Sequence, residues 1–194
     1  MDLAHMLMEQ LGGGALSSIG GRIGADEDTT GSALSAAIPL LISGLARNAA
    51  EPQGAESLHQ ALAEDHDGSV LDDLGGFLSD PEAANGAGIL GHVLGAKQPA
   101  VTRELASGTG LDAGQVGQVL RIAAPLVMGA LGRQQKAEGL DTTGLAALLG
   151  GQEQQAHASN PDLMGMLTGL LDADKDGSPL DEIAGLAGKF LQDK

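Results

Sequence analysis

The sequence contains no cysteine, no tryptophan and no tyrosine, and two phenylalanines are the only large aromatic side chains among its 194 residues. Without thiols the chain can form no disulfide, hold no thiolate-bound zinc and use no thiol nucleophile. The same absence leaves the redox state of the compartment open. Any core must be built from aliphatic side chains, because large aromatic anchors are missing.

Basic side chains are also scarce: 10 Lys and Arg residues stand against 26 Asp and Glu residues, which gives a formal net charge of −16. Affinity for nucleic acid depends on Lys and Arg side chains that neutralise phosphates. We therefore expect no nucleic-acid partner. An unidentified protein partner, or self-association, is the expectation that remains.

The chain also lacks a long hydrophobic run. The longest strongly apolar segment, residues 33–45, is much shorter than the roughly 20 residues that a membrane-spanning helix needs, and Pro39 interrupts it. The first residues lack the basic region of a secretory signal, and Glu9 falls within their apolar stretch. These features predict a cytoplasmic protein without a membrane span, with association at the cell envelope as the open alternative.

The residues that are present favour helices. Leucine is abundant, whereas isoleucine, valine and threonine, which favour strands, are scarce. Leu, Ile, Val and Phe together make up about a quarter of the chain, more than the roughly one-fifth below which a highly charged chain is read as disordered. The 31 glycines are about twice the usual share. We predict an all-α fold with short Gly-rich connections.

Two parts of the sequence match each other. Residues 26–47 align with residues 112–133 at a constant offset of 86. The matched pairs in this block are Asp26/Asp112, Leu34/Leu120, Ala37/Ala123, Pro39/Pro125, Leu40/Leu126, Leu45/Leu131 and Arg47/Arg133. Upstream, residues 3–7 resemble residues 90–94 at an offset of 87. The sequence therefore predicts a tandem duplication of a small multi-helix unit.

The second copy carries an insertion. Residues 65–69 resemble residues 174–178 at an offset of 109, and the extra residues fall around 150–160. The glycine- and glutamine-rich sequence there is typical of a flexible linker. The predicted organisation is a first helical repeat at 1–80, the start of the second repeat at 81–150, the linker at 151–160 and a C-terminal helix-loop-helix at 161–194, which completes the second repeat.

Residue types also place helix boundaries. Asp26 and Asp112 each precede a long apolar pattern with helical spacing, which predicts two N-caps. Pro39 and Pro125 lie in the middle of these patterns, so we expect a kink or a break at each. The glycines at 20–21 predict a break between helices.

The segment 172–182 has carboxylates at alternate positions and then a glycine that permits a sharp turn, as in the first half of an EF-hand Ca²⁺ loop. An EF-hand has glutamate at the twelfth position, where this chain has Ile183, so the loop is closer to shortened EF-hand-like loops. The predicted ligands of Ca²⁺, for which Mg²⁺ could substitute, are Asp172, Asp174, Asp176, the carbonyl of Ser178, Asp181 and Glu182. The alternative is a capping box at 178–181 without a metal.

A weaker second site is predicted in the first repeat. Its ligands would be Asp65, Asp67, the carbonyl of Ser69 and Asp72, with Asp73 as the substitute for Asp72 and Glu64 as an additional ligand. Ala63 stands where the second repeat has Asp172, so one carboxylate is missing. A plain capped turn over residues 69–72 is the favoured interpretation of this loop.

No motif indicates catalysis. Residues 86–91 match Gly-x-Gly-x-x-Gly, but the residues before them cannot form the buried strand of a dinucleotide-binding fold, so close helix packing is the favoured interpretation. No Gly-x-Ser-x-Gly or comparable nucleophile motif occurs. We expect a protein that is not an enzyme. An enzyme whose site is assembled across the two repeats is the open alternative.

The blocks at 34–45, 88–94 and 123–127 resemble the YidB-like family of bacterial domains of unknown function. The resemblance covers nearly the whole chain and implies a bacterial source and an all-helical fold with a homeodomain-like arrangement. It supplies no catalytic residues. A DNA-associated regulator would then use residues 112–133 as its recognition helix, but that segment carries only two arginines. The favoured prediction is a non-enzymatic, Ca²⁺-binding interaction, scaffold or regulatory protein.

Overall fold

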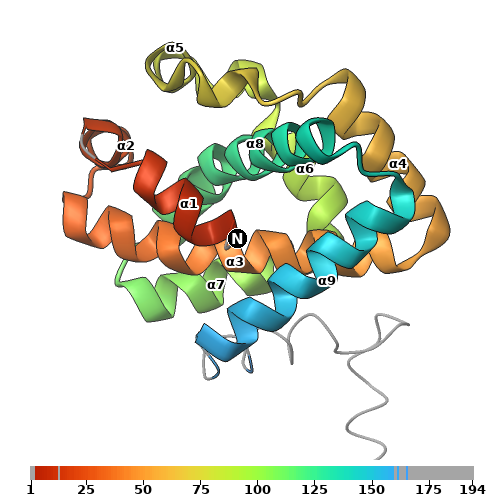
Figure 1. Ribbon diagram of the computed structural model, residues 1–194. Coiled ribbons are helices and arrows are strands. Elements are labelled where there is room, and N and C mark those ends of the chain that lie inside the picture. Colours follow the sequence, from red (N-terminus) through yellow and green to blue (C-terminus); the bar gives the residue numbers. More distant parts are fainter. Residues whose placement is uncertain (1–2, 13, 160, 162–164, 166–194) are drawn as a thin grey trace, which may run out of the picture.

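The structure, a computed structural model, describes residues 3–12, 14–159, 161 and 165, and every regular element in this part of the chain is helical (Figure 1). The prediction of an all-α fold is therefore confirmed. The α-helices are α1 (Leu3–Gln10), α2 (Gly14–Ile23), α3 (Glu27–Ala50), α4 (Pro52–Glu64), α5 (Leu74–Ser79), α6 (Gly86–Val93), α7 (Gln98–Thr109), α8 (Ala113–Glu138) and α9 (Thr142–Ser159). Three short 3₁₀ helices are η1 (Ser69–Leu71), η2 (Pro81–Ala84) and η3 (Gly95–Lys97).

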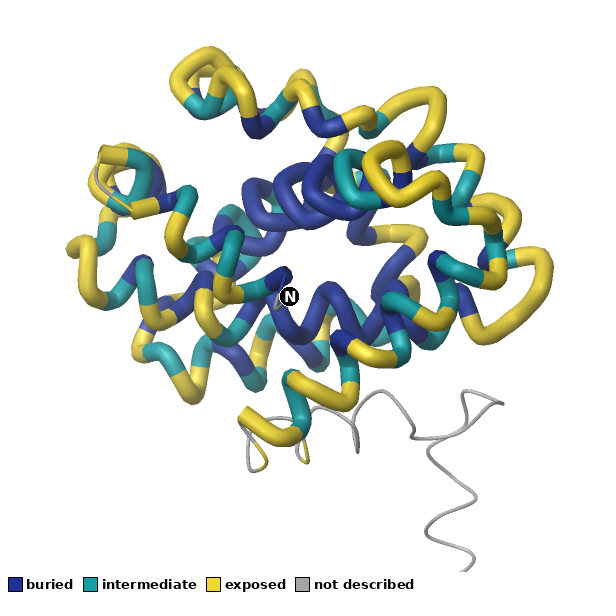
Figure 2. The backbone as a smooth tube through the Cα atoms, viewed as in Figure 1, coloured by how far each residue is buried: buried dark blue, intermediate teal, exposed yellow. Residues whose placement is uncertain are grey.

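Two long helices, α3 and α8, contact each other at the centre of the fold. Helices α1, α2, α4 and α9 pack against α3, and α4, α6, α7 and η1 pack against α8. Figure 2 shows the buried residues concentrated along these two helices. Leu34, Ile38, Leu120 and Leu126 are completely buried, and each such side chain stabilises the fold by about 1.5–3 kcal/mol. The core is therefore aliphatic, as the lack of aromatic residues requires.

Both central helices begin at the predicted aspartates. The Thr29 backbone N–H donates to the Asp26 carboxylate at 2.8 Å. The Gln115 N–H donates to the Asp112 carboxylate at 2.9 Å, while the Asp112 N–H donates to the Gln115 side chain at 2.9 Å. These bonds satisfy donors that a helix start leaves unpaired, so both predicted N-caps are confirmed.

The two mid-helix prolines do not end their helices. Pro39 lies inside α3 and Pro125 lies inside α8, and both helices run through without interruption. A proline removes one backbone hydrogen bond. The residues on either side of each proline are buried among other helices, and this packing keeps the helix continuous where the sequence allowed a break.

Helix α3 is long and apolar enough to cross a membrane by length and composition alone, with a mean hydropathy of 1.4 over its most apolar window. Inside the protein, however, 72% of that window is buried. The core helix of a soluble protein has the same properties. In the described part of the chain, no other helix meets the same criteria.

The segment predicted as a flexible linker, residues 151–160, is helical through Ser159, because α9 continues over it. This corrects the prediction. Glutamine, glutamate and alanine are good helix formers, which offsets the cost of the two glycines. Gln152 is buried in α9, and its side-chain oxygen accepts a hydrogen bond from the Leu3 backbone N–H at 2.9 Å. The inserted residues therefore bind the first helix to the last described one.

The predicted break at residues 20–21 is also wrong, because both glycines lie inside α2. A Cβ at Gly20 would lie only 2.7 Å from the Ala25 carbonyl oxygen. Glycine is needed there for a close approach of the chain that follows α2. A similar reason explains the first glycine of the Gly-x-Gly-x-x-Gly match: a Cβ at Gly86 would overlap the Arg121 carbonyl, so α6 packs closely on α8.

Candidate functional site

The acidic loop of the first half, residues 65–72, connects α4 to η1 and lies on the surface of α8. A Cβ at Gly132 of α8 would overlap the His66 carbonyl oxygen, so the loop backbone is in direct contact with the helix. Gly68 has a φ of 96°, in the left-handed region that favours glycine. The two glycines therefore fix the path of the loop: one lets it approach, and the other lets it turn.

Arg133, one helical position beyond Gly132, holds this loop. Its Nη2 donates to the Gly68 carbonyl at 2.9 Å and to the Asp72 carboxylate at 2.6 Å. Two oxygens from different parts of the loop thus converge on a single positively charged nitrogen. Charge-assisted hydrogen bonds of this kind are short and directional, so the turn is built around a cationic group.

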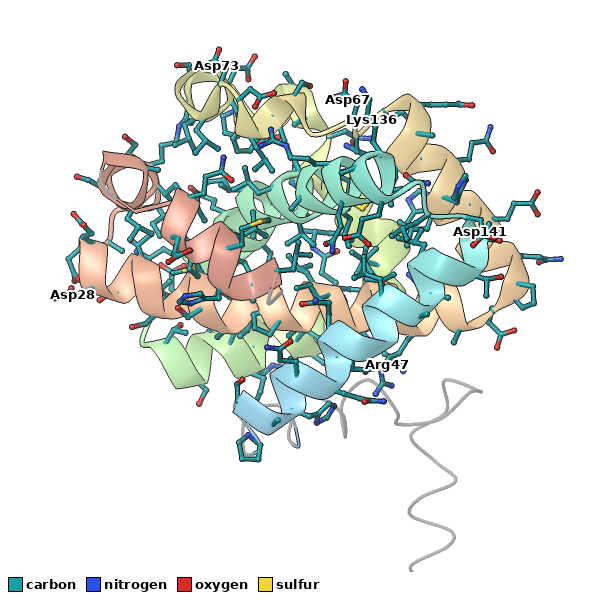
Figure 3. All side chains as sticks on the ribbon, in the orientation of Figure 1. Asp28, Arg47, Asp67, Asp73, Lys136 and Asp141 are labelled. Atoms are coloured by element: carbon teal, nitrogen blue, oxygen red, sulfur yellow. The ribbon has the colours of Figure 1, made fainter. Side chains whose placement is uncertain are left out.

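Two of the remaining predicted ligands of this loop, Asp67 and Ser69, have other partners. The Ser69 backbone N–H donates to the Asp67 carboxylate at 3.0 Å, and the Ser69 carbonyl accepts from the Asp72 N–H at 3.0 Å. The hydrogen bonds from Ser69 and, secondarily, the positive charge of Lys136 hold the pKa of Asp67 below its ordinary value. Figure 3 shows Asp67 and Lys136 close together at this end of the protein.

These contacts favour the capped turn over a cation site at Asp65, Asp67, Ser69 and Asp72. In the described residues, no group of three or more Asp, Glu or His side chains is arranged to hold a metal ion. The stronger predicted site, formed by Asp172, Asp174, Asp176, Ser178, Asp181 and Glu182, lies outside the described residues and stays a prediction. Sequence reasoning missed Arg133, although its match with Arg47 was a signal that could have found it.

Arg47, at the matched position of α3, lies beside a different carboxylate. Its Nε is 3.8 Å from the Glu153 carboxylate of α9. The side chains of Arg47 and Glu153 are only 27% and 24% exposed, against 42% and 74% for Arg133 and Asp72. Figure 3 shows Arg47 on the α9 side of the protein, away from the acidic loop. The two matched arginines thus bind acids from different elements.

A groove of about 1000 Å³ opens where α3 and α4 meet α6 and α8. Its apolar lining comes from all four helices and consists of Leu45, Leu58, Ala61, Ile89, Val93 and Met128. Arg47, Asn48, Glu51, His66 and His92 are among its polar lining residues. Sequence reasoning gave no signal for this groove, because its walls come from segments far apart in the chain.

Two polar side chains of the groove, Asn48 and His92, are bonded within the fold. The Asn48 side chain donates to the His92 carbonyl at 2.9 Å, and His92 Nδ1 lies 2.8 Å from the Gly88 carbonyl. Burial lowers the pKa of His66, and the nearby charge of Asp65 opposes this shift only in part. Imidazoles can transfer protons near neutral pH. The lining as a whole is better suited to holding an apolar group than to chemistry on a polar one.

A family model described as "Bacterial protein of unknown function (DUF937)" matches residues 5–134 of this chain. This match spans α1 to α8 almost entirely and includes both central helices, the acidic loop and Arg133. No curated protein and no solved structure matches the chain.

Proposed function

The chain belongs to the DUF937 family of bacterial proteins of unknown function, and we propose that it is a non-enzymatic, Ca²⁺-responsive interaction protein built from two copies of a helical unit. The Ca²⁺ ligands would be those of the second acidic loop.

The correspondence of the two halves supports the duplication. Helices α3 and α8 begin at residues 27 and 113, 86 residues apart as in the sequence match. Each follows an aspartate N-cap and contains a proline. Leu34 and Leu120, which are matched, are both completely buried. Arg47 and Arg133, also matched, each lie beside an acid from another element.

One observation carries the cation proposal: the Gly68 carbonyl and the Asp72 carboxylate both point at the Arg133 guanidinium. At the offset of 109, their counterparts are Gly177 and Asp181. The second loop has Asp172 where the first loop has Ala63, which completes the alternate spacing of Asp172, Asp174 and Asp176. Together with Asp181, Glu182 and the Ser178 carbonyl, such a loop can supply the six to eight oxygen ligands that Ca²⁺ takes.

Isothermal titration of the full chain with CaCl₂ tests the proposal. We expect saturable binding that is abolished by Asp174→Ala together with Asp176→Ala. Asp65→Ala together with Asp67→Ala, at the matched positions of the first loop, is the control and should leave the titration unchanged. A titration of the wild type without heat, and without a Ca²⁺-dependent rise in melting temperature, would overturn the proposal. MgCl₂ in place of CaCl₂ shows whether the smaller ion substitutes.

The alternatives are weaker. A DNA-associated regulator would present residues 112–133 to DNA, but most of α8 is buried. Of its two arginines, Arg133 binds the acidic loop, and Arg121 lies 4.0 Å from the Glu82 carboxylate. An enzyme assembled between the halves would use the groove, but the lining of that groove is largely apolar. We therefore favour an interaction protein over both.

A further inference from the structure

The groove between α3, α4, α6 and α8 is large enough for several aliphatic side chains, and among the described residues no side chain fills it. We propose that residues 163–171 of the same chain bind in this groove as an amphipathic helix. The proposal concerns the groove, not the acidic loop, and it stands whether or not the second loop binds Ca²⁺.

The sequence of this segment fits the groove. Leu163, Met166, Leu167, Leu170 and Leu171 recur at the spacing that places them on one face of a helix. The segment between Asp162 and Asp172 contains no charged residue. A helix with such a face binds by laying it into an apolar groove, and the groove offers Leu45, Leu58, Ile89, Val93 and Met128.

The segment starts within reach of the groove. Ser159, the last residue of α9, lies near Ser35 and Pro39 of α3, and the groove begins at Leu45 on the same helix. Pro39 and Leu45 are six residues apart on α3, a rise of roughly 9 Å. Arg47 also lines the groove and pairs with Glu153 of α9, so the groove borders the helix from which the segment leaves.

Charge and linkage favour this occupant over a second copy of the protein. Each chain carries a formal charge of −16, so two copies repel each other. A segment linked to the groove by a few residues has an effective concentration on the order of millimolar and meets no such barrier.

The absence of cysteine allows a clean test by disulfide trapping in the full chain. Ser57 is exposed and lines the groove, so one variant combines Ser57→Cys with Met166→Cys on the apolar face of the segment. The matched control combines Ser57→Cys with Gly165→Cys, one residue away but on the opposite helix face. Circular dichroism verifies that both variants fold before mild oxidation is started.

We expect the Met166→Cys pair to form an intramolecular disulfide about ten times faster than the control pair, because binding in the groove raises the local concentration of one face only. Adding Leu163→Ser, Leu167→Ser and Leu170→Ser should reduce its rate to that of the control. Equal rates for the two pairs would overturn the proposal. A disulfide that forms only between chains, at a rate that rises with protein concentration, would overturn it in favour of a second copy.

A second measurement uses the absence of tryptophan. Leu167→Trp places a single indole in the segment, and its emission should be shifted to shorter wavelength and protected from acrylamide if the segment lies in the groove. Thr168→Trp, on another face, is the control. Emission of both variants at the wavelength of a water-exposed indole would overturn the proposal independently of the disulfide rates.

Discussion

The C-terminal parts of α3 and α8 each place an arginine beside a carboxylate, but the two carboxylates come from different elements. Each ends near an arginine that matches the other in sequence. Arg133 of α8 binds the acidic loop that directly follows α4. Arg47 of α3 lies beside Glu153, which belongs to the segment around residues 150–160 where the insertion of the second half falls. Arg133 therefore binds a carboxylate from the acidic loop of the first half, whereas Arg47 lies beside a carboxylate from the inserted turns of α9.

The first acidic loop has a structural task that depends on two neighbouring residues of α8. In the first half the loop is a structural turn, with Gly132 and Arg133 beneath it. In α3, the position that matches Gly132 is Ala46, whose side chain is buried. A loop backbone cannot approach α3 at Ala46 as closely as it approaches α8 at Gly132.

The largest expected effect comes from filling the contact between α8 and the first loop. Gly132→Ala would place a Cβ against the His66 carbonyl, a backbone group that cannot rotate away, and should lower the free energy of unfolding by about 2–3 kcal/mol. Urea unfolding followed by far-UV circular dichroism measures this. Gly117→Ala, at an open position of the same helix, is the control and should raise stability by about 0.5–1 kcal/mol.

The reverse substitution at the matched position sharpens the comparison. Ala46→Gly should cost about 1 kcal/mol, the ordinary price of glycine in a helix. A cost for Gly132→Ala no larger than this would mean that the loop is not held against α8 as the structure indicates.

The inserted part of α9 should also contribute to stability, contrary to its sequence-based interpretation as a linker. Gln152→Ala removes the acceptor of the buried hydrogen bond from Leu3 and should lower the free energy of unfolding by about 1–2 kcal/mol. Gln154→Ala, exposed on the same helix, should change it by less than about 0.5 kcal/mol. If both variants unfold at the same urea concentration, the inserted residues do not stabilise the fold.

Breaking the arginine contact of the first loop should have a smaller effect. Arg133→Met keeps the aliphatic stem but removes the hydrogen bonds to Gly68 and Asp72, and should cost about 1 kcal/mol. The Gly68 carbonyl keeps its bond from the Leu71 N–H, which limits the loss. Asp72→Asn should cost less than about 0.5 kcal/mol, because Asp72 is largely exposed. A larger cost for Asp72→Asn than for Arg133→Met would contradict this order.

Local signals in the sequence were sufficient for the central helices. The Asp26 and Asp112 caps and the apolar spacing behind them predicted where α3 and α8 begin, because capping depends on residues only three positions apart. Predictions failed where distant contacts outweigh local preference. Gln152 is the clearest case: it is buried in α9, and its side chain accepts a hydrogen bond from Leu3, 149 positions away.

The candidate sites show the same difference between local sequence signals and distant contacts. The pattern of the first acidic loop was visible in the sequence, and the capped turn was its favoured interpretation. The cation that binds this loop is the Arg133 guanidinium. It could not be predicted from the sequence pattern of the loop, because 61 positions separate Arg133 from Asp72. The groove was invisible for the same reason. Spacing along the chain thus identifies possible ligands, whereas the fold decides whether a metal or an arginine meets them.

The smallest expected effect is on pH dependence and involves His66, which has Lys175 as its counterpart in the second loop. Burial lowers the pKa of His66 from its ordinary value of 6.5. Below pH 6.5 the unfolded chain therefore takes up a proton more readily than the folded one, and the contribution of His66 to stability is lost as the pH falls toward its folded pKa. Urea midpoints measured from pH 8 down to pH 5 should decrease for the wild type and decrease less for His66→Asn. Identical slopes would show that His66 is not buried against the groove, and the first loop would then lie less firmly on α8 than the Gly132 contact requires.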